Sequence, residues 1–297
     1  MIKVIEMKCK RCGRKAIANL KQYKVTLCEK CYPNFYLELV KRSIKRYKIV
    51  RRDEKILACV SGGKDSTAMA FTLKKLNYNI EMFYIDLGIG EYSIKSKKVV
   101  EELAETIDVN LHVVKLKDFG FTIDDVDVKK VCSVCGTAKR YLMNRFARLN
   151  GFDVIATGHT VEDMILFFIK NVLSGGIEWI AKLIPRSESF DERLVTRVRP
   201  LFERSEKENM LLVLAINLPF LADECPHAPQ DIWKEIIYEI ELKRPGFKSN
   251  FIRGLIKLAK NIKVDNTWEV KYCKECGEVT NSDLCAFCRY VKKFSKK

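Results

Sequence analysis

Apolar residues follow two alternating patterns along the middle of the chain. Short runs that are apolar throughout, such as Ile56 to Val60, are typical of buried strands, whereas longer stretches with apolar residues three or four positions apart are typical of helices. Strands that alternate with helices predict an α/β fold with a parallel sheet covered on both faces. We expect strands at 56–60, 80–85, 111–116 and 154–157, and helices at 36–48, 66–76, 93–107, 137–149 and 162–173.

The length of the chain allows one large core with small additions. Of its 297 residues, 47% are hydrophobic, which suffices for one large core or two modest ones. The two ends are short and rich in cysteine, so neither end can hold a core of its own. We expect three parts: a small domain at 1–34, a large domain at 35–265, and a second small domain at 266–297.

Composition indicates the compartment in which the protein acts and the kind of partner it binds. No apolar run approaches the roughly 20 residues that a membrane span needs, and the N-terminus lacks the apolar region of a secretory signal. We therefore expect a cytoplasmic protein that does not enter a membrane. The formal net charge of +16 favours a polyanionic partner, nucleic acid first. A generally Lys-rich proteome is the alternative explanation.

The twelve cysteines are the strongest compositional signal. Ten of them form five CxxC pairs, a pattern that indicates metal or redox chemistry in a reducing compartment. At each end, two pairs follow each other at the spacing of a zinc ribbon, in which four thiolates surround one Zn²⁺. Redox pairs are the alternative, and the ribbons serve either as structural caps or as modules that grip RNA. The expected zinc ligands are Cys9, Cys12, Cys28 and Cys31 at one end, and Cys273, Cys276, Cys285 and Cys288 at the other.

A glycine-rich hexapeptide, Ser61-Gly62-Gly63-Lys64-Asp65-Ser66, lies between the first expected strand of the sheet and the helix that follows. Its glycines let backbone amides close on a phosphate, and the helix N-terminus adds partial positive charge. Lys64 can pair with phosphate oxygens, and both serines can donate hydrogen bonds. The spacing is not that of a Walker A loop. The hexapeptide resembles the PP-loop of the ATP pyrophosphatases, which adenylate an oxygen and release pyrophosphate.

A second motif, Gly158-His159-Thr160-Val161-Glu162-Asp163, follows the 154–157 strand and should face the same crevice. It resembles the GHNxDD motif of the same family, with Thr160 in place of Asn and Glu162 in place of Asp. Gly158 permits a close approach of backbone to nucleotide. Asp163 is expected to act as a general base or to orient Mg²⁺; a carboxylate that only favours the helix dipole is the alternative. His159 is expected to be structural.

A third group consists of Cys132, Cys135 and the distant Cys225. Three cysteines suit a 4Fe–4S cluster with one iron left open, which can present sulfur to an activated carbon. The alternatives are a dithiol that carries a persulfide and a third zinc site completed by His227. Cys59 lies within a strand, so its thiol is expected to be inert, while its backbone lies close enough to the PP-loop to line the ATP site.

Together these motifs resemble the TtuA-type tRNA 2-thiouridine synthetases of the TtcA/TtuA superfamily of PP-loop ATP pyrophosphatases. The resemblance covers nearly the whole chain and includes the segments 85–93 and 132–142 and the pair Cys225-Pro226. It implies a nucleotide alpha hydrolase domain, with a Rossmann-like parallel sheet, between two zinc ribbons. It also implies that Ile85 and Gly158 help the PP-loop to hold ATP, with Lys139 close by. Catalysis is assigned to Lys64 and Asp163, with Cys132 and Cys135.

The resemblance implies an ATP-dependent tRNA sulfurtransferase that replaces O2 of a uridine with sulfur. Position 54 is the favoured target, and the wobble position 34 or a cytidine is the alternative. The expected cofactors are ATP, Mg²⁺, one cluster and two Zn²⁺. The sulfur donor is a ubiquitin-like protein thiocarboxylate or sulfide, and the relatives suggest a homodimer. The tRNA backbone is expected to meet basic helices that carry Lys243, Arg244, Lys248, Arg253, Lys257 and Lys260, for which a solvated helix face is the alternative.

Two other classes of protein stay open at this point. An amide-forming synthetase of PP-loop type would use ammonia as the nucleophile and would not need the three cysteines. A zinc-ribbon RNA-binding protein with a decayed nucleotide site would bind tRNA without releasing pyrophosphate. The intact hexapeptide argues against decay.

Overall fold

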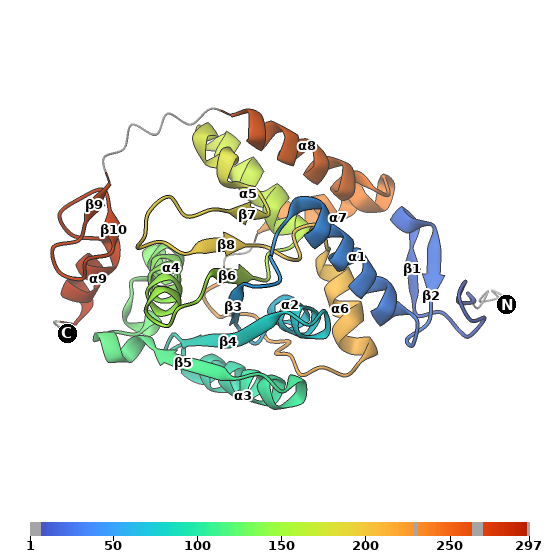
Figure 1. Ribbon diagram of the computed structural model, residues 1–297, viewed down its shortest axis with the longest axis horizontal. Coiled ribbons are helices and arrows are strands. Elements are labelled where there is room, and N and C mark those ends of the chain that lie inside the picture. The colour runs from blue at the N-terminus through green and yellow to red at the C-terminus, as the bar shows by residue number, and fades with distance from the viewer. Residues whose placement is uncertain (1–6, 229–230, 263–269, 296–297) are drawn as a thin grey trace.

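The computed structural model describes residues 7–228, 231–262 and 270–295. A six-stranded sheet forms its centre, with the strand order β5-β4-β3-β6-β8-β7 (Figure 1). All neighbouring strands run parallel except β7, which pairs antiparallel with β8. The strands of this sheet are β3 (Lys55–Val60), β4 (Asn79–Asp86), β5 (Leu111–Lys115), β6 (Val154–Thr157), β7 (Arg186–Ser187) and β8 (Thr196–Val198).

Helices surround this sheet, and a small two-stranded sheet lies near each end of the chain. The α-helices are α1 (Tyr32–Tyr47), α2 (Lys64–Lys75), α3 (Gly90–Ile107), α4 (Val131–Leu149), α5 (Val161–Leu173), α6 (Glu206–Ala215), α7 (Ile232–Lys243), α8 (Phe247–Asn261) and α9 (Ala286–Phe294). Short 3-10 helices are η1 (Lys21–Tyr23), η2 (Leu116–Phe119), η3 (Ile123–Asp125), η4 (Val128–Lys130) and η5 (Ile177–Lys182). The small sheets pair β1 (Ala18–Leu20) with β2 (Val25–Leu27), and β9 (Lys271–Tyr272) with β10 (Val279–Thr280).

The predicted strands and helices of the central domain are confirmed, although α1, α3 and α4 each begin three or more residues before the predicted start. Helix α1 begins at Tyr32 instead of residue 36, because Pro33 stands in its first turn, where proline is tolerated. Helix α4 begins at Val131 instead of residue 137, so Cys132 and Cys135 lie in its first two turns. None of the described helices combines the length and apolarity that crossing a lipid bilayer requires.

Strand alternation divides the core into two clusters, one on each face of the sheet. Ile56, Ala58 and Val60 belong to one cluster, together with residues of α1, α2, α3, α5, α6 and α8. Leu57 and Cys59 point the other way, into a cluster that includes α4 and α9. The side chains of β3 therefore pack alternately into the two core clusters, one on each face of the sheet.

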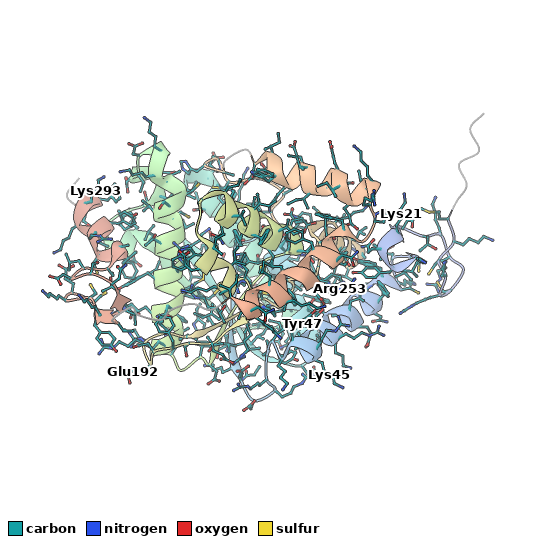
Figure 2. All side chains as sticks on the ribbon, turned by 90° about the horizontal axis from the view of Figure 1, so that it is seen from above. Lys21, Lys45, Tyr47, Glu192, Arg253 and Lys293 are labelled. Atoms are coloured by element: carbon teal, nitrogen blue, oxygen red, sulfur yellow. The ribbon has the colours of Figure 1, made fainter. Side chains whose placement is uncertain are left out.

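Each cysteine-rich end extends one of these clusters. The N-terminal hairpin adds Leu20 and Leu27 to the first cluster. At the C-terminal end, Phe287 of α9 joins the second cluster and stacks on Tyr141 of α4 with ring centroids 3.9 Å apart. Figure 1 shows the two cysteine-rich ends at opposite ends of the molecule, and Figure 2 labels Lys21 at one of them and Lys293 of α9 at the other. Helix α1 starts directly after Cys31, so the expected division at 34/35 falls within its first turn. The division at 265/266 lies outside the described residues.

The order of the strands creates a switch point. From β3 the chain moves outward to β4 and β5, and then returns to place β6 on the other side of β3. Loops that follow β3 and β6 therefore leave neighbouring strands and diverge, which opens a crevice at the carboxyl ends of these strands. Both sequence motifs lie there.

Candidate active site and metal centres

The PP-loop is held in shape by its own serines. Ser66 Oγ donates to the carbonyl of Gly63 at 3.0 Å and accepts the N–H of Ser61 at 3.1 Å. Gly62 has a φ of +84°, which favours glycine, and a Cβ there would lie 3.1 Å from the carbonyl oxygen of Ser96. Helix α2 begins at Lys64, and Gly63 before it has no side chain to cap the helix. The N-terminal amides of α2 therefore face the loop, as an anion site requires.

The second motif touches the first through its backbone. A Cβ on Gly158 would lie 2.9 Å from the backbone nitrogen of Ser66 and 3.0 Å from the carbonyl of Asp65. Only glycine permits this contact without a shift of the PP-loop. The sequence predicted a close approach of Gly158 to nucleotide, and the structure shows a close approach to the loop itself.

Asp163 makes contacts through both of its carboxylate oxygens. Its Oδ2 accepts the N–H of Thr160 at 2.9 Å and the hydroxyl of Thr160 at 3.1 Å, which forms a capping box at the start of α5. Its Oδ1 lies 2.9 Å from Nζ of Lys234. Burial raises the pKa of Asp163, but the Lys234 ammonium and the Thr160 N–H outweigh burial and lower it below its usual value. Asp163 is therefore both a helix cap and an ionised partner of a lysine.

A chain of ion pairs joins the two motifs. Lys64 Nζ lies 3.1 Å from both Asp65 and Glu206, and Lys234 Nζ lies 2.6 Å from the other oxygen of Glu206. Burial raises the pKa of Glu206, yet the two ammonium groups lower it overall. We call the sequence Asp65–Lys64–Glu206–Lys234–Asp163 the ion-pair chain. It places the PP-loop lysine and Asp163 in one electrostatic unit.

Two members of this chain, Glu206 and Lys234, were missed by sequence reasoning. They come from α6 and α7, far in sequence from either motif. One local signal was available for Glu206: Ser205 and Glu208 form a capping box that fixes it in the first turn of α6. No comparable signal marks Lys234.

Glu162, the second departure from the family motif, forms a buried ion pair with Lys248. The carboxylate and Lys248 Nζ are 2.5 Å apart, and their side chains are 6% and 9% exposed. The other oxygen of Glu162 accepts the N–H of Glu206 at 3.2 Å. The expectation that Lys248 contacts the tRNA backbone is therefore wrong, because its ammonium is buried in an ion pair with Glu162 of α5.

His159 and Cys59 both occupy buried positions. Burial lowers the pKa of His159 to about 4, so its imidazole is neutral, and Nδ1 lies 2.8 Å from the Thr157 hydroxyl. Burial raises the pKa of the Cys59 thiol to about 12. These surroundings agree with a structural imidazole and an inert thiol.

The three remaining cysteines approach one another beside the PP-loop. Leu221, in the segment that carries Cys225, donates its N–H to the carbonyl of Gly62 at 2.8 Å, while Cys132 Sγ donates to the carbonyl of His227 at 3.3 Å. Burial raises the pKa of Cys135; the neighbouring Lys139 ammonium opposes this rise, and Cys225 and Cys132 add to it. Lys139 therefore lies against the cysteine group.

This donor set fits a cluster better than a single ion. Cys132 is exposed and Cys135 and Cys225 are partly buried, so the group is accessible from outside. It is absent from the described groups whose ligand atoms all lie within 4.8 Å of one another. A 4Fe–4S cluster binds each thiolate on a different iron, which requires wider spacing than one tetrahedral ion does. His227 directs Nε2 at Asp124, 2.8 Å away, instead of at these thiols.

Each cysteine-rich end brings four sulfur atoms within 4.8 Å of one another. Backbone N–H groups point at the first cysteine of each set. Burial raises the pKa of Cys9, but hydrogen bonds from the N–H groups of Cys28 and Arg11 outweigh burial and lower it to about 6. The pKa of Cys273 is lowered to about 6 by its own backbone donors, again against burial. Closely spaced thiolates that accept hydrogen bonds from backbone N–H groups suit tetrahedral coordination of Zn²⁺.

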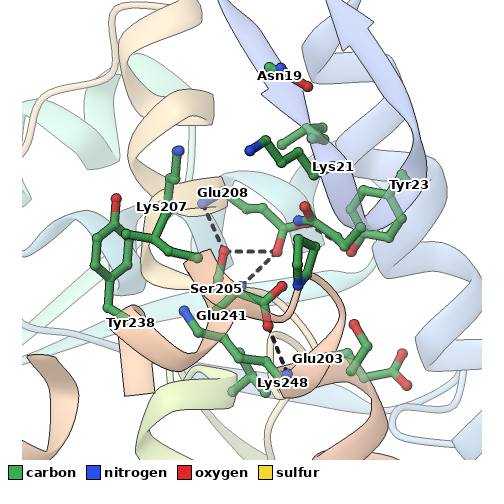
Figure 3. A pocket seen from close by; sticks show the side chains of 16 residues that line it. Asn19, Lys21, Tyr23, Glu203, Ser205, Lys207, Glu208, Tyr238, Glu241 and Lys248 are labelled. Carbon is green, nitrogen blue, oxygen red and sulfur yellow. Dashed lines mark hydrogen bonds between the residues drawn. The ribbon is translucent and has the colours of Figure 1, made fainter. Parts of the chain in front are cut away.

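A separate cavity of about 230 Å³ lies between the N-terminal hairpin and helices α6 to α8 (Figure 3). Its carboxylates already have partners: Glu208 accepts from Ser205 and Tyr23, and Glu241 accepts the N–H groups of Gly246 and Lys248. No PP-loop residue lines this cavity. None of the five residues of the ion-pair chain lines it either.

Comparisons with known proteins agree with this geometry. The family model for the PP-loop domain matches residues 36–230. The tRNA-5-methyluridine(54) 2-sulfurtransferase of Pyrococcus horikoshii is 41% identical, and the alignment covers 96% of this chain and 93% of that protein. The enzyme of the same name from Thermotoga maritima is 34% identical, with 98% of each chain covered. The solved structure of the U34-tRNA thiolase NcsA from Methanococcus maripaludis, with its 4Fe-4S cluster, superposes with a TM-score of 0.79 at 25% identity over 97% of both chains.

Proposed function

The chain belongs to the PP-loop family that includes the tRNA-5-methyluridine(54) 2-sulfurtransferases, and on this basis we propose that it is an ATP-dependent tRNA sulfurtransferase. It replaces O2 of a tRNA uridine with sulfur, at position 54. One observation supports the proposal most directly: the Leu221–Gly62 hydrogen bond ties the segment of Cys225 to the loop that would hold ATP. Activation and sulfur transfer can then share one crevice.

The first step is adenylation of the uridine. ATP lies with its phosphates on the PP-loop and the N-terminus of α2, where Lys64 exchanges its carboxylate partners for phosphate oxygens. Asp163, ionised at neutral pH, accepts the N3 proton of the uridine, which makes O2 nucleophilic. O2 then attacks the α-phosphorus; the new P–O bond forms as the bond to pyrophosphate breaks. Mg²⁺, when bound, neutralises phosphate charge.

The second step exchanges oxygen for sulfur. A 4Fe–4S cluster held by Cys132, Cys135 and Cys225 would supply an iron without a protein ligand, at which a sulfide can bind as a nucleophile. Sulfur forms a bond to C2, and the C2–O bond breaks so that AMP leaves with the former uridine oxygen. Lys139, which lies against Cys135, is placed to offset negative charge on the sulfur. The base returns to its neutral form by regaining a proton at N3.

The remaining parts of the proposal concern partners and cofactors. Two Zn²⁺ stabilise the terminal ribbons, and the net charge of +16 favours binding of tRNA in the cytoplasm. The sulfur comes from a protein thiocarboxylate or from sulfide, and the functional unit is a homodimer. Supplying each donor in turn separates the two sources, and light scattering gives the oligomeric state.

Reconstitution tests the proposal. The anaerobically purified protein is mixed with tRNA that lacks thionucleosides, ATP, Mg²⁺ and sulfide. The expected products are a 2-thiolated uridine and equal amounts of AMP and pyrophosphate. Pyrophosphate release that depends on ammonia and persists in Cys132→Ala would favour the amide-forming synthetase. Binding of tRNA without pyrophosphate would favour an RNA-binding protein with a decayed site.

A further inference from the structure

A second cavity, of about 310 Å³, lies where α4, β8 and the C-terminal ribbon meet. Three arginines from these three elements line it: Arg140 of α4, Arg197 of β8 and Arg289 of α9. Figure 1 shows α4 beside the β9–β10 hairpin and α9, so the cavity lies at the joint between the central domain and the ribbon. We call it the arginine cavity.

The positive charge of this cavity is not neutralised within the part of the chain that the structure describes. Its one carboxylate, Glu278, is buried and occupied by Arg145 and Arg148. Among the described side chains, Arg140 and Arg289 hydrogen-bond only to hydroxyl groups, those of Thr137 and Ser282.

The guanidinium of Arg197 makes no hydrogen bond or ion pair with any described side chain, although it is partly buried. Burial lowers its pKa, and so does the charge of Arg140. Guanidinium groups that share a cavity without a counter-ion repel each other, and an anion in the cavity would remove that cost.

The position of the cavity connects it to the cysteine group. Arg197 pairs in register with Ile155, whose side chain belongs to the core on the α4 face of the sheet. The guanidinium of Arg140 folds back along α4, so that a Cβ on Gly136 would lie 3.2 Å from it. Gly136 directly follows Cys135. An anion between Arg140 and Arg197 would therefore lie beside the part of α4 that carries Cys135.

We propose that the arginine cavity binds a phosphodiester group of the RNA substrate, next to the nucleotide that is modified. The proposal rests on the proposed function for the identity of the RNA. Planar guanidinium groups bind phosphate through paired hydrogen bonds. The PP-loop already provides for the phosphates of ATP, so the phosphate of this second site comes from the RNA backbone. Such a contact fixes the register of the tRNA without reading its sequence.

The test measures tRNA binding at several salt concentrations for Arg140→Gln and Arg289→Gln, both of which change exposed side chains. Arg42→Gln, an exposed arginine on α1, is the matched control. Each cavity variant should raise the Kd for tRNA about tenfold and reduce the slope of log Kd against log salt by about one. The control should leave both quantities, and the KM for ATP, unchanged.

Three results would overturn the proposal. An unchanged Kd in both cavity variants means that no phosphate binds there. A raised KM for ATP with unchanged tRNA binding means that the cavity holds a nucleotide phosphate instead. An equal effect of Arg42→Gln means that general surface charge is responsible. Failure of the wild type to thiolate tRNA would remove the proposed function itself, whereas thiolating wild type with unaffected variants removes only the arginine cavity.

Discussion

The ammonium of Lys234 lies 2.9 Å from Oδ1 of Asp163 and thereby fixes the carboxylate that the second motif supplies. Lys234 comes from α7 and also holds Glu206, the partner of the PP-loop lysine. The position and the ionisation of Asp163 therefore depend on a residue that lies outside both motifs.

Replacement of Lys234 by Met should change the pH dependence of the reaction. Lys234 is the main group that holds the pKa of Asp163 below its usual value against the effect of burial. Without it this pKa rises, so on the acid side activity is lost at a higher pH than in the wild type. A rate lower by about ten- to a hundredfold should accompany the shift. Lys243→Met on the same helix is the control, and an acid limb that stays in place would show that Asp163 is not the titrating group.

Gly158→Ala should damage ATP use, because the new methyl group would lie 2.9 Å from the Ser66 nitrogen in the PP-loop. The measurement is the KM for ATP in pyrophosphate release, which should rise about tenfold or more. Gly254→Ala is the matched control: nothing lies within 4 Å of its Cβ position in α8, and alanine there should stabilise the helix by about 0.5–1 kcal/mol. Equal kinetics for the two variants would contradict the tight contact.

Lys248→Met should destabilise the fold by about 3–5 kcal/mol, because it leaves the buried Glu162 carboxylate without its partner. Urea unfolding of Lys248→Met, Glu162→Gln and the double variant measures this cost. The double variant should recover a large part of the loss. If Lys248→Met lowers the free energy of unfolding no more than replacement of a surface lysine does, the pair is not buried in solution.

The cysteine groups should lose metal independently of one another. Cys12→Ser and Cys276→Ser should each remove about one zinc per chain and lower thermal stability, because metal supplies most of the folding energy of a small ribbon. Cys59→Ala should keep both ions, since this thiol lies in the core of the sheet. Mass spectrometry of the metal content measures the zinc bound per chain. A ribbon variant that keeps both zinc ions would disprove the ligand set of that ribbon.

Cys225→Ala should abolish the visible absorption of an iron–sulfur cluster in anaerobically purified protein while zinc content stays constant. His227→Ala should retain that absorption, because its Nε2 is bound to Asp124. A colourless wild type with full activity would instead favour a persulfide on Cys132 and Cys135, and loss of the colour in His227→Ala would restore a role for the imidazole.

Much of the fold could be predicted because its signals are local. The β3, β4 and β6 runs are mostly apolar, as strands buried on both faces must be, although β4 carries Glu81 near its start. Strands β7 and β8 escaped prediction because they are only two and three residues long and carry Arg186 and Arg197. Such short strands are recognisable only when the neighbouring β6 is in place.

The site was predictable to the extent that motifs are contiguous. The PP-loop and the Gly158 motif meet as their positions after neighbouring strands required. Glu206 could be placed in the first turn of a helix by the Ser205–Glu208 capping box, but its ion-pair partners could not be predicted. Lys234 was not predictable, because a single charged residue in a helix looks like any solvated one. Lys248 was wrongly predicted to contact tRNA, because the basic residues around it suggested an exposed helix face. Its buried partner, Glu162, comes from another helix and cannot be recognised from the local sequence.

The central claim is tested most directly by mass spectrometry of tRNA nucleosides from cells that lack this gene, with mapping of the modified position. The account predicts loss of one 2-thiouridine-type nucleoside at position 54, regained with the wild type but not with Asp163→Ala or Cys132→Ala. Loss at position 34 would keep thiolation and change its target. An unchanged thionucleoside profile, in cells without a redundant paralogue, would contradict the account and point to another substrate for the PP-loop.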